Sequence, residues 1–156
     1  DPNFTKEGTY AEFDAYGSAK SAVLLYAVAL NRRLGPRGVR AVAPTPGRVE
    51  THLQDHVKSL GRERLTGMYE KAALKVYGKS MGEVAQEEPR KTLEQGSSTT
   101  LYAALDPDLA SQDGVYVNHC QLRTDPNEVK DWATDPELAE RCWKMSEALV
   151  GQTFNF

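Results

Sequence analysis

The sequence lacks several features that mark whole classes of protein. It has only two cysteines, Cys120 and Cys142, without the CxxC spacing of a metal or redox site, so free thiols in a reducing compartment are the simplest interpretation. The longest apolar run, residues 22–30, is far shorter than the roughly 20 residues of a membrane-spanning helix. A net charge of -3 argues against a nucleic-acid-binding protein. We therefore expect a cytoplasmic domain with no transmembrane segment and no nucleic-acid partner.

Glycine is scattered along the chain, and no G-x-G-x-x-G turn able to hold a dinucleotide pyrophosphate occurs. Helical and strand patterns alternate instead, which indicates an α/β fold. The expected helices are 10–34, 51–60, one or two within 62–91, 92–105 and 137–150, and the expected strands are 39–43 and 114–122. Gly35 should end the first helix, and Asp135 should cap the last. Trp132 and Trp143 should pack the last helix, and residues 151–156 should be loose.

Tyr16-Gly-Ser-Ala-Lys20 stands at the start of the first expected helix. Side chains four residues apart lie on one face of a helix, close enough to interact. An isolated tyrosine titrates near about 10, too high for a base at neutral pH. A cation about 4 Å away stabilises a phenolate by up to roughly 4 kcal/mol at an effective dielectric constant of about 20. Lys20 could thus let Tyr16 exchange protons near neutral pH, although the spacing also allows a half-buried tyrosine beside a solvated lysine.

The Tyr-xxx-Lys motif is part of an ordered series. It is followed by a helix of small residues, the strand 39–43, Pro46-Gly-Arg-Val-Glu-Thr51, a helix 94–105 and the strand 114–118. This series resembles the short-chain dehydrogenase/reductase family, with its Tyr-xxx-Lys signature and its Pro-Gly-x-Val-x-Thr motif. The resemblance runs from about residue 3 to residue 150. Within the family, the sequence most resembles the retinol-dehydrogenase-like and WW-domain-oxidoreductase-like branch, of fungal type.

The resemblance implies an NAD(P)-dependent oxidoreductase that transfers a hydride between nicotinamide and a small alcohol or carbonyl substrate. Tyr16 would be the general acid/base, and Lys20 would assist it and hydrogen-bond the nicotinamide ribose. The implied cofactor-binding residues are Tyr16, Lys20, Pro46, Gly47, Val49 and Thr51. NADP is slightly favoured over NAD as the cofactor.

The implied fold is the C-terminal portion of a Rossmann-like doubly wound parallel sheet, with two core strands and about four to five helices. By the resemblance, the expected fold lacks the family's N-terminal nucleotide-binding half and its catalytic serine. We expect residues 1–156 to form a single incomplete domain, with residues 52–91 as a substrate-loop insertion. A homodimer through helix 10–34 is a further expectation. The alternative hypothesis is an inactive family-derived fragment that acts only as a protein-association module.

No metal site is expected. His52 and His56 are spaced i, i+4 and could share a helix face, but no third ligand lies near them in sequence. A solvated helix face is the simpler interpretation of this pair.

Overall fold

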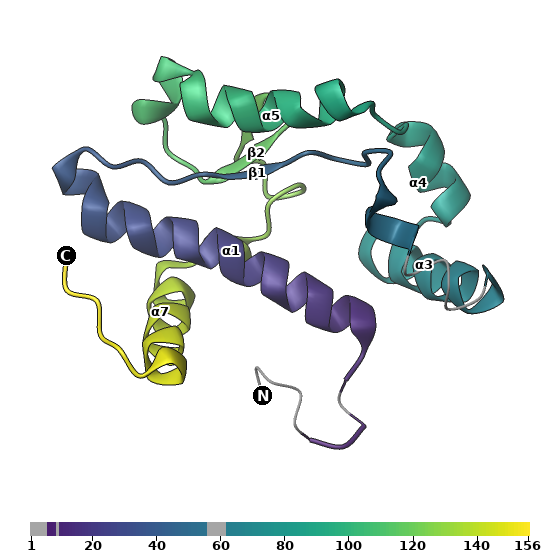
Figure 1. Ribbon diagram of the computed structural model, residues 1–156, viewed down its shortest axis with the longest axis horizontal. Helices are drawn as coiled ribbons and strands as arrows, with labels where there is room; N and C mark the ends of the chain where they lie inside the picture. The colour runs from purple at the N-terminus through teal and green to yellow at the C-terminus, as the bar shows by residue number, and fades with distance from the viewer. Residues whose placement is uncertain (1–5, 9, 56–61) are drawn as a thin grey trace. The chain divides into compact units, whose positions relative to one another are not determined.

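The computed structural model describes residues 6–8, 10–55 and 62–156. Helices alternate with short strands, which confirms the expected α/β class (Figure 1). The chain divides into two compact units. The first comprises Asp1–Thr45 and Thr99–Phe156, and the second comprises Pro46–Ser98.

The first unit contains a sheet with the strand order β1-β2-β3. β1 (Ala43–Thr45) pairs with β2 (Tyr116–Asn118) in parallel, and β2 pairs with β3 (Gln121–Arg123) in antiparallel fashion. Val117, at the centre of β2, is fully buried. The two expected core strands are therefore present and parallel, and a third strand extends the sheet.

The expectation of one continuous strand over residues 114–122 was wrong. His119 and Cys120 have φ angles of 50° and 54°, and they form the two-residue turn between β2 and β3. A two-residue hairpin turn with both φ angles positive matches the right-handed twist of its strands, and Asn-Gly is its usual sequence. Because neither residue is glycine, the sequence carries no recognisable signal for this turn.

The first strand also begins later than the expected 39–43, and it includes Pro44. The Ala43 N–H donates to the Val115 carbonyl at 2.7 Å. Successive backbone N–H groups point to opposite sides of a strand, so the nitrogen of Pro44 faces away from β2. The N–H that proline lacks is therefore not needed for a hydrogen bond between the strands.

The segment before β1 is held by a side chain of the first helix. The side-chain amide of Asn31 donates to the Ala41 carbonyl at 2.9 Å and accepts from the Ala41 N–H at 2.7 Å. Asn31 thus satisfies the extended backbone in the manner of a neighbouring strand. Residues 39–42 consequently run alongside the helix and lie outside the sheet.

α1 (Glu12–Leu34) confirms the long first helix. It ends at Leu34 with Gly35 as its C-cap, as expected, but Gly35 remains right-handed and starts a 3-10 turn, Gly35–Arg37. The left-handed residue is Gly38, with φ of 80°. The chain therefore reverses three residues later than the Gly35-Pro36 pair suggests.

α7 (Pro136–Val150) crosses α1 within the first unit, as Figure 1 shows. Ala29 and Ala139 are each only 1 % exposed at the contact, and their small side chains let the two helix backbones approach closely. Trp143 fills the adjoining space, with its ring centroid 5.9 Å from that of Tyr26. These residues form the core of the helix pair.

Arg33 joins the same two helices through a cation–π contact and an ion pair. Its guanidinium lies 4.4 Å from the centroid of the Trp143 ring and donates to Glu140 Oε2 at 2.7 Å. The hydrogen bond from Arg33 lowers the pKa of Glu140. The guanidinium of Arg33 thus lies over the Trp143 ring and donates a hydrogen bond to the Glu140 carboxylate.

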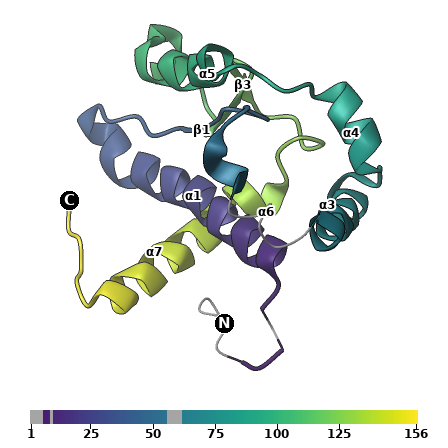
Figure 2. The same ribbon diagram turned by 45° about the vertical axis from the view of Figure 1, so that its right-hand side comes forward.

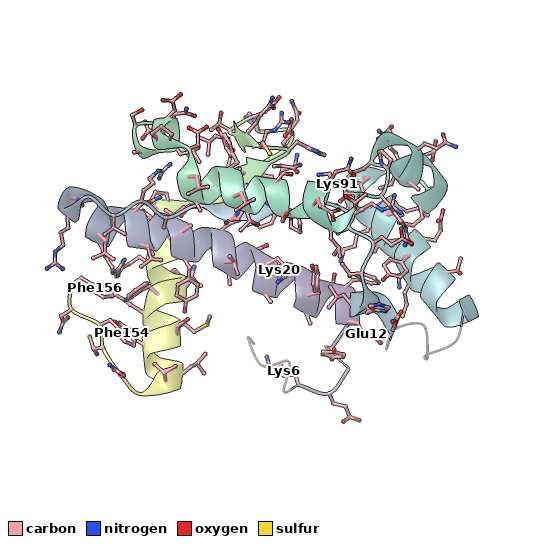
Figure 3. The ribbon with its side chains drawn as sticks, turned by 45° about the horizontal axis from the view of Figure 1, so that its top comes forward. Lys6, Glu12, Lys20, Lys91, Phe154 and Phe156 are labelled. Atoms are coloured by element: carbon pink, nitrogen blue, oxygen red, sulfur yellow. The ribbon has the colours of Figure 1, made fainter. Side chains whose placement is uncertain are left out.

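The C-terminal tail is exposed but contacts α7 through its two phenylalanines, which corrects the expectation that residues 151–156 are loose. Phe154 and Phe156 lie 6.4 Å and 5.9 Å from Trp143, centroid to centroid, in edge-on arrangements (Figure 3). The Phe154 N–H also donates to Glu147 Oε1 at 2.8 Å. Trp143 therefore contacts both α1 and the tail, whereas Trp132 is 54 % exposed.

Two shorter elements complete the first unit. The 3-10 helix η3 (Pro107–Ala110) follows Asp106, whose carboxylate accepts from the Asp108 N–H. α6 (Asp131–Thr134) contacts α1 (Figure 2). Neither element was expected from periodicity, because both are too short to show it.

The second unit contains two helices in the region where one or two were expected. α3 (Arg62–Tyr77) is followed by α4 (Met81–Glu87), which starts with a reciprocal capping box between Ser80 and Glu83. α5 (Leu93–Leu105) confirms the expected helix 92–105 and runs from the second unit into the first. The expected helix 51–60 begins as a 3-10 turn, His52–Gln54, and residues 56–61 lie outside the described residues.

The N-cap of α7 gives a direct test of the helix that organises the first unit. Asp135 Oδ1 accepts from the Leu138 N–H at 2.7 Å. Asp135→Ala removes this acceptor and should lower the free energy of unfolding by about 1 kcal/mol, measured by urea denaturation. Asp131→Ala, which removes a first-turn carboxylate of α6 that caps no helix, should cost less than about 0.5 kcal/mol. Equal losses in the two variants would contradict the assigned cap.

Candidate functional site

Tyr16 and Lys20 occupy the N-terminal half of α1, one helical turn apart; Figure 3 labels Lys20 on this helix. The Lys20 ammonium lies over the Tyr16 ring, 5.4 Å from its centroid. Tyr16 is 62 % exposed. The structure therefore brings the two residues together, as their spacing predicted, and presents the tyrosine to solvent.

The helix backbone next to this pair carries no side chain at Gly17. Gly17 follows Tyr16 on α1, and among the described residues no atom outside the helix backbone and its neighbours lies within 4 Å of the position a Cβ would take there. A glycine inside a helix costs up to about 1 kcal/mol relative to alanine. Here it leaves open surface next to the tyrosine, where a bound molecule could approach the helix.

The second group of expected site residues forms the loop 46–51, directly after β1. Gly47 has φ of +74°, a left-handed conformation that side chains other than glycine rarely adopt. A Cβ at this position would also lie 2.8 Å from Lys91 Nζ and 3.0 Å from Glu88 Oε1. The backbone angle therefore favours glycine at Gly47, and a side chain there would also displace the ends of the Lys91 and Glu88 side chains.

The middle of this loop pairs with a distant segment in a parallel bridge between Val49 and Lys91. The Lys91 N–H donates to the Arg48 carbonyl at 2.8 Å, and the Glu50 N–H donates to the Lys91 carbonyl at 3.0 Å. In such pairing, successive residues direct their backbone groups to opposite sides. The N–H and C=O of Val49 consequently point to the edge opposite Lys91.

Thr51 ends the loop and begins the 3-10 turn that follows. Its Oγ1 accepts from the Leu53 N–H at 3.2 Å, and the residue is exposed. Because this bond uses an oxygen lone pair, the hydroxyl hydrogen can still be donated to a bound group. The loop thus offers a peptide edge at Val49 and a hydroxyl donor at Thr51.

The expected site residues fall into two groups, one in each unit. Tyr16 and Lys20 belong to the first unit, and Pro46, Gly47, Val49 and Thr51 belong to the second. Analysis of the sequence missed Lys91, which lies outside both motifs. A lysine in a charged stretch gives no local signal of a contact with a loop some forty positions earlier.

Metal chemistry has no support in the part of the chain that the structure describes, since it contains no group of three or more His, Cys, Asp and Glu side chains that could hold an ion. The Nδ1 atom of His52 lies 2.8 Å from Asp55 Oδ2, and His56 lies outside the described residues. Over the same described ranges, no helix has the length and hydropathy to cross a bilayer.

Curated proteins with similar sequences carry consistent names. The chain is 32% identical over 151 residues to the short-chain dehydrogenase/reductase prx1 of Penicillium roqueforti, an alignment that covers 92% of this chain and 40% of that protein. It is 34% identical over 143 residues to the short-chain dehydrogenase TIC 32 B, chloroplastic, of Brassica napus, with coverage of 90% and 38%. It is 33% identical over 138 residues to a WW domain-containing oxidoreductase of Danio rerio, with coverage of 87% and 28%.

Over about nine tenths of its own length, the chain is thus similar to proteins named short-chain dehydrogenases/reductases or oxidoreductases. It spans about two fifths of the length of the short-chain dehydrogenase/reductase from Penicillium roqueforti (40%), consistent with part of such a domain. No family model matches the chain, and no solved structure matches it.

The backbone angle and the steric contact at Gly47 can be tested separately. Gly78 has φ of +66°, close to the +74° of Gly47, but among the described residues no atom beyond its chain neighbours lies within 4 Å of its Cβ position. Gly78→Ala should therefore cost only the strain of a left-handed residue, about 1 kcal/mol. Gly47→Ala should cost about 1 kcal/mol more, because Lys91 must leave its hydrogen bond to the loop. Urea denaturation measures both, and equal losses would contradict the steric requirement.

Proposed function

We propose that the protein containing this chain is an NAD(P)-dependent oxidoreductase that transfers a hydride between nicotinamide and a small alcohol or carbonyl substrate. The observation that carries the proposal is the contact of Lys20 with an exposed Tyr16 on one face of α1. The names of the relatives support an oxidoreductase. NADP is slightly favoured over NAD as the cofactor.

Tyr16 would act on the proton of the substrate oxygen. In alcohol oxidation it takes the hydroxyl proton, and in carbonyl reduction it donates a proton to the oxygen. The nicotinamide, when bound, supplies or accepts the hydride on the substrate carbon. Lys20, one turn along the helix, would stabilise the phenolate form of Tyr16 and donate a hydrogen bond to the ribose.

The loop 46–51 would hold the nicotinamide carboxamide. A carboxamide has one carbonyl acceptor and one NH₂ donor, and the edge of the Val49 peptide presents an N–H donor and a C=O acceptor that complement it. The Thr51 hydroxyl adds a donor at the end of the loop. The described loop therefore fits this group by its donor and acceptor pattern, and binding there would fix which ring face meets the substrate.

Replacement of the tyrosine hydroxyl tests the proposed chemistry. In the full protein encoded by the gene that carries this sequence, Tyr16→Phe should lower kcat by about 10²- to 10⁴-fold, because the proton donor and acceptor is lost. NADPH affinity, measured by titration of intrinsic fluorescence, should change less than about threefold. Tyr77→Phe removes an equally exposed hydroxyl on α3 and should leave kcat unchanged.

Two results would overturn the proposal. Undiminished turnover in Tyr16→Phe would remove the tyrosine from the reaction. Absence of NADPH and NADH binding by the full protein would remove the cofactor and would favour a non-enzymatic association role.

A further inference from the structure

The loop 46–51 is supported by a second segment of the chain, residues 88–96, which belongs to the same unit. Besides the backbone bridge between Val49 and Lys91, two side chains join the segments. Lys91 Nζ donates to the Pro46 carbonyl at 3.3 Å, and Arg48 Nη1 donates to the Glu88 carbonyl at 2.9 Å. Each segment therefore provides one cationic side chain that binds the backbone of the other.

Lys91 is the residue at which these contacts converge. Its backbone pairs with the middle of the loop, while its ammonium bonds the first carbonyl of the loop and lies beside Gly47. Figure 3 shows Lys91 at the start of α5. A single residue thus fixes both the entry and the centre of the loop.

Gly96 sets how closely α5 approaches the loop. A Cβ on this buried glycine would lie 2.4 Å from Val49 Cγ2 and 3.0 Å from Val49 Cγ1. Real Cβ contacts do not occur at 2.4 Å, so the Val49 side chain occupies space that only glycine leaves open. A side chain at position 96 would force Val49, and the peptide edge it carries, to shift.

We infer that Lys91 and Gly96 are positioning residues for the nicotinamide carboxamide. This inference rests on the function proposed above. Lys91 holds the loop at Pro46 and along Arg48 to Glu50, and Gly96 seats the Val49 side chain. Together they fix the direction in which the N–H and C=O of Val49 point, away from Lys91. Neither residue touches the reacting atoms, so their loss acts on the geometry of the bound cofactor.

The first measurement needs no cofactor. Amide hydrogen exchange over residues 46–51 in the full, unliganded protein should be about threefold to tenfold faster in Lys91→Met, which keeps the alkyl stem and removes the ammonium. Lys79→Met is the matched control, because it removes an ion pair to Glu87 in the same unit, and among the described residues no hydrogen bond or ion pair joins Lys79 to the loop. It should leave exchange over residues 46–51 unchanged. Unchanged exchange in Lys91→Met would overturn the role of the ammonium.

The second measurement separates positioning from general stability. Lys91→Met and Gly96→Ala should raise KM for NADPH by about threefold to tenfold with kcat changed less than threefold. They should also reduce the stereospecificity of transfer from NADPH deuterated on one face of the nicotinamide. Gly67→Ala, a helical glycine of α3 with open space around its Cβ position, is the control and should change neither.

A double variant tests the contact at Gly96 even if Gly96→Ala folds poorly. Val49→Ala removes the two methyl carbons that meet the new Cβ and keeps the peptide edge. Gly96→Ala combined with Val49→Ala should therefore recover most of the affinity for NADPH. Failure to recover it, with both proteins folded, would overturn the role of Gly96. If the parent protein binds no nicotinamide cofactor, the proposed function fails, and hydrogen exchange still decides whether Lys91 holds the loop.

Discussion

The parallel pairing of β1 with β2 is the constraint on which the rest of the first unit depends. It joins Ala43 to Tyr116 and encloses the fully buried Val117. Parallel strands cannot be joined by a tight turn, so the chain must leave the carboxyl end of β1 and return by a long crossover. Ligands of open α/β sheets bind beyond the carboxyl ends of parallel strands. The loop 46–51 begins at that end because of the connection alone, whatever its sequence.

Small residues allow close contact between elements in both units. Ala29 and Ala139 let α1 and α7 meet, and Gly96 lets α5 accept the Val49 side chain. In each case the contact depends on a side chain that is small or absent. Because protein interiors are closely packed, even one added methyl group would disturb it. The two contacts differ in what they hold. The alanines hold two long helices with their own large interface, whereas the glycine determines the position of a single loop residue.

The sequence was sufficient for features whose cause is local. The periodicity of α1, α5 and α7 predicted these helices, and Asp135 before Pro136 predicted the start of the last one. The contact between Tyr16 and Lys20 followed from helical spacing for the same reason. These features depend on residues within one turn of each other, so tertiary context has little power to change them.

The features that could not be predicted depend on distant residues or on unusual backbone angles. The hairpin turn at His119 and Cys120 uses positive φ angles without a glycine, and the aromatic packing of the tail depends on Trp143. The same is true of the candidate site. The loop motif was visible in the sequence, but the bridge from Val49 to Lys91 was not, because nothing local to either residue indicates the other.

This difference in origin implies a difference in how the two halves of the candidate site respond to change. The Tyr16–Lys20 pair needs only the first turns of α1 to be helical, so it persists in any state that keeps this helix. The loop needs a second segment to be folded and in register, since its conformation depends on Lys91 and Gly96. Substitutions far from the tyrosine would therefore act through loop position and cofactor affinity, while loss of proton transfer would require a change on α1 itself. The proposed proton-transfer pair depends on one helix, whereas the conformation of the proposed orienting loop depends on the fold of the second unit.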